Sequence, residues 1–92
     1  MLSAFVLVDA EPGRVAALAS ELAEIPGVAE VYSVTGKADL VAVVRVREHD
    51  ELADVVTRRI SALPGITATE TMVAFQAFSR HDLDAMWSVG LE

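Results

Sequence analysis

The chain has 92 residues, of which 53% are hydrophobic, and it carries a net charge of −7. A chain of this length forms one domain whose folding hides only about two thirds of the unfolded surface, so some apolar side chains are expected to face another subunit. The negative charge disfavours direct contact with nucleic-acid phosphates, and the absence of cysteine excludes disulfides and thiolate metal sites and favours a reducing, cytoplasmic location.

The first predicted strand covers residues 2–8, and its side chains are apolar on both alternating faces. Its apolar run ends at Asp9, far short of the roughly 20 residues that cross a bilayer, so we interpret it as a strand rather than a signal peptide or membrane span. An amphipathic helix is predicted over residues 13–25, because apolar side chains recur there every three or four positions.

The middle of the chain predicts two strands, at residues 28–35 and 40–46, joined by a turn at residues 36–39. The second of these strands is the most continuously apolar segment and is expected at the centre of the sheet. A second helix is predicted over residues 50–63, with acidic side chains in its first turn and Arg58 and Arg59 in its last, as the helix dipole favours.

The last predicted strand spans residues 66–78, where Thr67, Thr69 and Thr71 alternate with other residues and therefore share one face. The tail, residues 79–92, carries a short apolar stripe and is predicted to be a small C-terminal helix that needs a docking surface.

The two halves of the chain repeat one pattern. Ile25-Pro26-Gly27-Val28 closes the first helix and Leu63-Pro64-Gly65-Ile66 closes the second, so that each half reads strand, helix, strand. Two right-handed crossovers place both helices on one face of a four-stranded antiparallel sheet. The predicted fold class is therefore α+β, a ferredoxin-like βαββαβ sandwich over residues 1–78. The other face is apolar and open, which predicts a homodimer that pairs the two sheets.

Three ordered motifs make the sequence resemble the effector-binding (RAM) domain of the leucine-responsive regulator/AsnC (Lrp/AsnC) family over about residues 2–78. They are Pro26-Gly27-Val28 with Val31-Tyr32-Ser33-Val34-Thr35-Gly36-Lys37-Ala38-Asp39-Leu40, then Leu63-Pro64-Gly65-Ile66, then Thr69-Glu70-Thr71. The resemblance implies dimers that assemble further into rings and bind small effectors, usually amino acids, between subunits. Full-length members carry an N-terminal helix-turn-helix domain, whereas here Met1 leads straight into the first strand, so a stand-alone regulatory domain is expected.

The resemblance also implies a site. Asp39 would receive the α-ammonium group of an amino acid, and Gly36 with neighbouring amides would meet its carboxylate. Glu70 points the opposite way along its strand and is expected to be a solvent or interface charge. The predicted ligand-binding residues are Gly36, Lys37, Ala38, Asp39, Thr69 and Thr71.

Each of these residues has a simpler interpretation. Asp39 is a common residue at the end of a hairpin turn, and Thr69 and Thr71 favour strands on an exposed face without binding anything. His49 and His81 lie at predicted helix starts and fit capping or surface roles better than a metal site.

The predicted function is a non-enzymatic module that senses an amino acid at subunit interfaces and modulates transcription through partners, with no cofactor, no metal, and no direct contact with nucleic acid or membrane. One alternative is a cofactorless dimeric α/β-barrel monooxygenase or isomerase, which shares the strand order. Another is a structural partner of full-length Lrp/AsnC regulators. Catalysis finds little support, since the chain has neither a cysteine nucleophile nor a Gly-x-Ser-x-Gly motif.

Overall fold

The structure is a computed structural model that describes residues 1–80. Its elements follow the predicted order, and the C-terminal helix predicted for residues 79–92 lies outside the described residues from position 81 onward. The elements are β1 (Leu2–Ala10), α1 (Val15–Ala23), β2 (Val28–Ser33), β3 (Leu40–Val46), α2 (His49–Asp54), the π-helical stretch η1 (Val55–Ile60) and β4 (Ile66–Val73).

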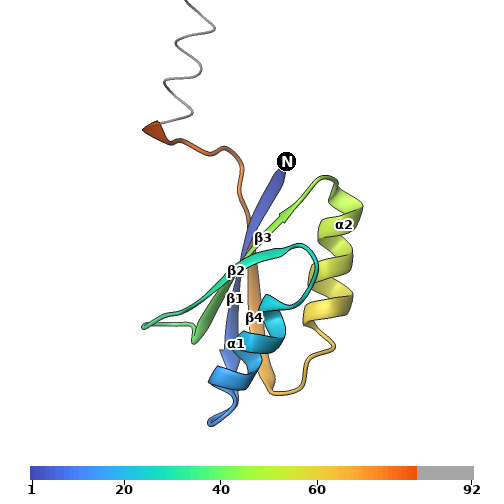
Figure 1. Cartoon of the computed structure of the whole chain (residues 1–92). Coiled ribbons are helices and arrows are strands. Elements are labelled where there is room, and N and C mark those ends of the chain that lie inside the picture. The colour runs from blue at the N-terminus through green and yellow to red at the C-terminus, as the bar shows by residue number, and fades with distance from the viewer. Residues whose placement is uncertain (81–92) are drawn as a thin grey trace, which may run out of the picture.

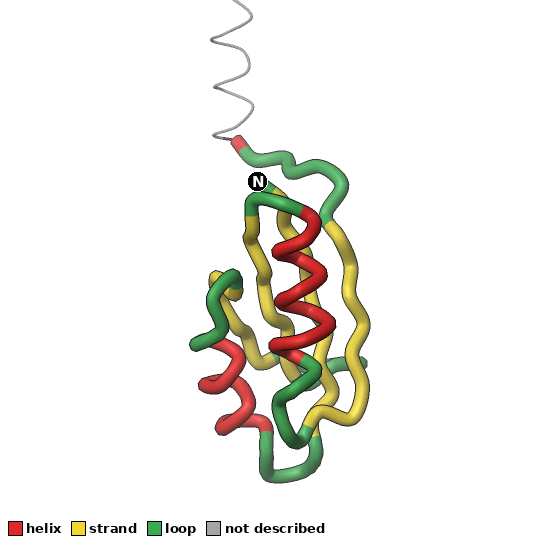
Figure 2. The backbone as a smooth tube through the Cα atoms, turned by 90° about the vertical axis from the view of Figure 1, so that its right-hand side faces the viewer, coloured by secondary structure: helices red, strands yellow, loops and turns green. Residues whose placement is uncertain are grey.

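The four strands form one antiparallel sheet in the order β2-β3-β1-β4. Both helical segments lie on the same side of this sheet, as Figures 1 and 2 show. This is the predicted α+β, ferredoxin-like sandwich, and β3 is central as expected. Within residues 1–80, no helix combines the length and the apolar composition that a membrane crossing requires.

The core lies between the sheet and the helices. Alternate residues of β1, namely Ala4, Val6 and Val8, are fully buried on this side, and α1 contributes its Leu18 and Leu22 stripe. The largest fully buried side chains are Leu18, Leu22, Leu40, Ile60, Val6, Val8 and Val44.

The opposite side of the sheet, which we call the open face, has no helix over it. Cross-strand partners share a face, and Phe5 lies opposite both Val43 and Met72. Phe5 is 38%, Met72 46% and Tyr32 50% exposed. The open face is therefore apolar at its centre and lacks cover within the described chain.

The strand predicted over residues 28–35 ends at Ser33, and the helix predicted over residues 13–25 covers only Val15–Ala23. Two further differences have a structural reason. The prediction that the last strand reaches residue 78 is wrong, because β4 ends at Val73 opposite Ala4. Its ladder partner β1 begins at Leu2, so only one more backbone bond follows, from the Ala74 N–H to the Ser3 carbonyl at 2.8 Å. The second helix is α-helical only to Asp54 and then widens into η1, which carries Arg58 and Arg59 in its last turn, as predicted.

Candidate functional site

The turn between β2 and β3 is held by backbone hydrogen bonds at its base. Gly36 has a φ of +107°, which only glycine adopts readily. The Val34 N–H donates to the Asp39 carbonyl at 3.0 Å, and the Asp39 N–H donates to the Val8 carbonyl, also at 3.0 Å. The turn is thus attached to the end of β1, two strands away from β2.

The Asp39 side chain strengthens this attachment. Its Oδ2 accepts the Ala10 N–H at 2.9 Å, at the point where a bulge between Asp9 and Ala10 shifts the register of β1 on β4. The Thr67 hydroxyl donates to the Asp9 carbonyl at 3.2 Å on the same bulge. Asp39 therefore positions both the turn and the neighbouring end of β1.

A hollow of about 240 Å³, the turn hollow, opens between this turn and the ends of β1 and β4. The turn forms one wall and the two strands form the other. Its lining residues are Leu7, Asp9, Lys37, Ala38, Ala68, Thr69 and Glu70.

Three charged side chains line the turn hollow: the ammonium of Lys37 and the carboxylates of Asp9 and Glu70. None of them forms an ion pair with another residue of the described chain. Ala38 is only 8% exposed, so the wall beside Lys37 is small and apolar. Groups of both signs close together suit a zwitterion, because charge-assisted hydrogen bonds are the stronger kind.

The predicted site residues are only partly brought together. Lys37, Ala38 and Thr69 line the turn hollow. Gly36 and Asp39 shape the turn without lining the hollow, and Thr71 lies opposite Val6, on the helix-covered side of the sheet, where it is exposed.

Two acidic residues of the hollow were missed. Glu70 is expected from the sequence to face away from the site, yet it lies opposite Leu7 and lines the hollow with it. From the sequence, Asp9 is expected only to end the first strand. The signal that could have found both is the pairing of β1 with β4, which brings these positions to the same side as the turn.

A polar cluster lies on the β2–β3 side of the open face. The Tyr32 hydroxyl donates to Glu30 Oε2, and the Arg45 guanidinium donates to Glu30 Oε1 at 3.2 Å. The Tyr32 hydrogen bond, aided by Arg45, holds the pKa of Glu30 below its usual range. The same hydrogen bond raises the pKa of the Tyr32 hydroxyl, because it favours the protonated phenol.

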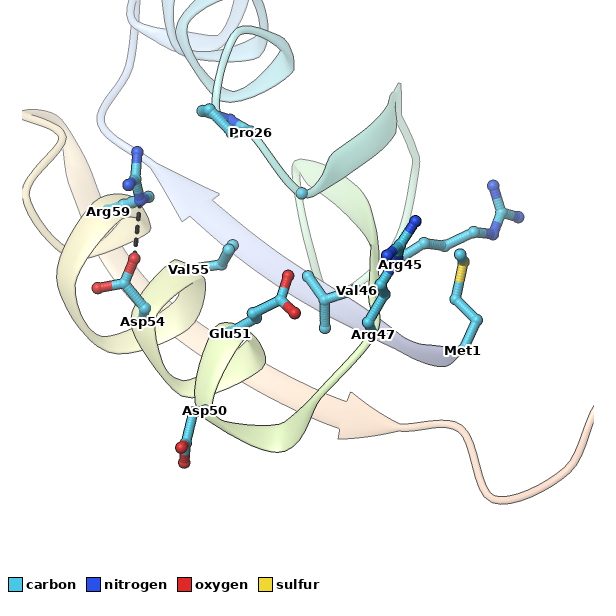
Figure 3. Close-up of a pocket in the computed structure, with 11 residues that line it drawn as sticks. Met1, Pro26, Arg45, Val46, Arg47, Asp50, Glu51, Asp54, Val55 and Arg59 are labelled. Carbon is cyan, nitrogen blue, oxygen red and sulfur yellow. Dashed lines mark hydrogen bonds and ion pairs between the residues drawn. The ribbon is translucent and has the colours of Figure 1, made fainter.

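A second hollow, of about 540 Å³, lies on the helix side between the Pro26 turn, the end of β3 and α2 (Figure 3). We call it the Pro-Gly hollow. Val46 and Val55 face each other in it, with the Glu51 side chain drawn between them, whereas the Arg59–Asp54 ion pair of 2.9 Å and Arg47 lie at its ends. In residues 1–80, no group of three or more His, Cys, Asp or Glu side chains is arranged to hold a metal ion.

The chain is similar to known proteins over most of its length. A family model described as the Lrp/AsnC ligand binding domain matches residues 3–83. The HTH-type transcriptional regulator FL11 of Pyrococcus horikoshii is 36% identical over 73 residues, which are 79% of this chain and 48% of that protein. The chain thus spans about half the length of the curated relatives it matches.

Several solved structures are also similar to this chain. TTHA0845 from Thermus thermophilus is 54% identical, with a TM-score of 0.82 over 87% of this chain and 100% of that one. A feast or famine regulatory protein from M. tuberculosis, complexed with L-methionine, is 29% identical, with a TM-score of 0.68 over 86% of this chain and 53% of that one.

Proposed function

The chain belongs to the Lrp/AsnC ligand-binding domain family, and on that premise we propose that it is a regulatory module that binds an amino acid in the turn hollow. The observation that carries the proposal is the convergence of Lys37, Asp9 and Glu70 on one small hollow. The M. tuberculosis relative complexed with L-methionine supports an amino acid as the ligand class.

The charges of the turn hollow suggest how the ligand is held. The Lys37 ammonium meets the ligand carboxylate, and the carboxylates of Asp9 and Glu70 meet its α-ammonium. Thr69 lines the hollow next to Glu70, but it lies opposite Val8, which places its side chain toward the helix-covered side of the sheet. Gly36 and Asp39 contribute by shaping the turn.

The proposal includes assembly. A second copy covers the open face, because Phe5, Tyr32 and Met72 together form an apolar surface of the kind that marks interaction sites. Leu7 belongs to this face and also lines the turn hollow, so pairing of sheets would deepen the hollow and bury the ligand. Dimers of this kind assemble into larger oligomers in which ligand binding biases the assembly.

The module acts without chemistry of its own. Its curated relatives are named as transcriptional regulators, and this supports a regulatory role in the cytoplasm rather than the monooxygenase or isomerase alternative. Because the net charge is −7, the domain itself does not hold nucleic acid and acts through partners, full-length Lrp/AsnC regulators among them.

A thermal-shift screen of the common amino acids tests the proposal, followed by calorimetric titration of those that stabilise the protein. At 100 times its dissociation constant, a ligand adds about 2.7 kcal/mol of stability. Lys37→Ala and Glu70→Gln should each weaken binding about tenfold or more, since each loses one charged partner. Arg58→Ala, an exposed charge away from the turn hollow, is the matched control and should bind like wild type. No stabilisation by any amino acid at millimolar concentration would reject the proposal.

A further inference from the structure

The floor of the turn hollow is built from two residue pairs of the β1–β4 ladder. Leu7 lies opposite Glu70, and Asp9 lies opposite Ala68. All four residues line the hollow, and their side chains lie on the open face, because Val8 between Leu7 and Asp9 is buried on the helix side and cross-strand partners share a face. The carboxylates of Asp9 and Glu70 therefore occupy one diagonal of a four-residue patch, and Leu7 and Ala68 occupy the other.

The two carboxylates of this patch are close enough to bind one ligand together. Diagonal positions of an antiparallel strand pair are about 7–8 Å apart. Neither carboxylate forms an ion pair with a basic side chain of residues 1–80. Because like charges repel one another at this range, a ligand that brings positive charge to both carboxylates is favoured over one that brings it to a single carboxylate.

The turn brings a single positive charge to these two negative ones. Asp39 attaches the turn to β1 immediately before and after Asp9, through its backbone N–H and its side chain. The turn that carries Lys37 therefore lies next to Asp9, whereas Glu70 lies one strand farther away, on β4. An amino acid without a charged side chain has no net charge, so it leaves the hollow with one carboxylate in excess.

We propose that the amino acid bound in this hollow under the proposed function, on which this inference rests, is a basic α-amino acid whose side chain ends in a second cation. The Lys37 ammonium meets the α-carboxylate, Asp9 meets the α-ammonium, and Glu70 meets the side-chain cation. The methylene groups between the two cations lie over Leu7 and Ala68, in the way that lysine side chains cover apolar surface in proteins.

Size and charge both favour this class of ligand. The volume of about 240 Å³ lies just below the range of roughly 300–1,000 Å³ that is typical of ligand pockets, which suits one amino acid rather than a larger metabolite. A neutral amino acid would make both carboxylates share one α-ammonium, and an acidic one would add a third carboxylate. The net charge of −7 on the whole chain also attracts a cationic ligand.

Calorimetric titration with lysine and with norleucine tests the charge preference, because the two side chains have the same carbon skeleton and only lysine carries the second cation. We expect lysine to bind about tenfold or more tightly at low salt. This ratio should shrink at high salt, because screening weakens a contact with the exposed Glu70. Glu70→Gln should bring the ratio close to unity. Lys37→Ala should weaken both ligands and leave the ratio unchanged, since both ligands carry the α-carboxylate.

Glu48→Gln is the matched control, because it removes the same charge from an exposed position at the end of β3 that lies away from the turn, and it should keep the wild-type ratio. Equal binding of lysine and norleucine by the wild-type protein would overturn the inference and leave the proposed function standing. No binding of lysine, with binding of another amino acid, would do the same, as would a preference for lysine that persists in Glu70→Gln. No binding of any amino acid would reject the proposed function and the inference together.

Discussion

The carboxylate of Asp39 accepts the Ala10 N–H at 2.9 Å, and the Asp39 N–H is bonded to Val8. From its position beside Gly36, this residue is readily interpreted as a ligand contact. Through these hydrogen bonds Asp39 has a structural role that does not require a ligand. A loss of binding in an Asp39 variant therefore reports on a direct contact only if the fold is shown to be intact.

Asp39→Ala should lower the free energy of unfolding by about 1–3 kcal/mol, because the partly buried Ala10 N–H loses its acceptor. Asp39→Asn keeps a carbonyl oxygen at the same place and should lose less than about 1 kcal/mol. Urea denaturation of the three proteins at the same pH measures both values. Equal stability of wild type and Asp39→Ala would show that this hydrogen bond contributes nothing.

Alanine substitutions at Gly27 and Gly13 distinguish the cost of backbone strain from the cost of side-chain crowding. Both have positive φ, +100° and +85°, but a Cβ at Gly27 would meet Val55 and Val46 whereas one at Gly13 would meet nothing. Gly13→Ala should cost only the strain of about 1–2 kcal/mol. Gly27→Ala should cost about 1–3 kcal/mol more, from overpacking. Thermal unfolding of the two variants gives the difference, and equal losses would contradict this packing of Gly27.

Among the elements, the repeated Pro-Gly turns and the apolar periodicities were sufficient to predict the order of strands and helices. These signals are local, since a helix stripe such as Leu18 and Leu22 is set by its own spacing. The end of β4 is set by a long-range contact instead. β4 ends at Val73 because its partner strand β1 begins at Leu2. No pattern within residues 66–78 contains that limit.

The same distinction between local signals and long-range strand pairing applies to the candidate site. Lys37 and Ala38 belong to the turn itself, so the motif could indicate them. Asp9 and Glu70 enter the hollow through the pairing of β1 with β4, whose register shifts at a bulge between Asp9 and Ala10. Both residues pair before that bulge, Glu70 opposite Leu7 and Asp9 opposite Ala68, so the register of the two strands places them. Alternation within one strand does not reveal that register.

The pairing of β2 with β3 places Glu30 between Tyr32 and Arg45. This arrangement predicts that the stability of the fold depends on the protonation of Glu30. The pKa of Glu30 is lowered in the folded protein. Its contribution to stability is therefore present above the unfolded pKa and is lost as the pH falls through the folded pKa. Tyr32→Phe should raise the pKa of Glu30 toward its usual value, and NMR titration of the carboxyl carbon measures it. An unchanged pKa in that variant would contradict the hydrogen bond, and Val34→Ala serves as the nearby control.

For the whole molecule, the uncovered apolar face is the feature that a monomer does not explain. Met72→Glu places a charge on the open face and should shift the protein toward single subunits in sedimentation velocity at micromolar concentration. Thr71→Glu is the matched control, because Thr71 is the adjacent exposed residue on the other side of the same strand. A wild-type protein that sediments as a single subunit would contradict pairing of the sheets.

The central claim is that an amino acid binds where the turn meets the ends of β1 and β4. Mapping of backbone amide shifts by NMR, during titration with the amino acid that most stabilises the protein, tests this most directly. We expect the largest shifts at residues 36–39 and 68–70, and their loss in Lys37→Ala. Shifts confined to the Pro-Gly hollow, or no shifts at millimolar ligand, would contradict the claim.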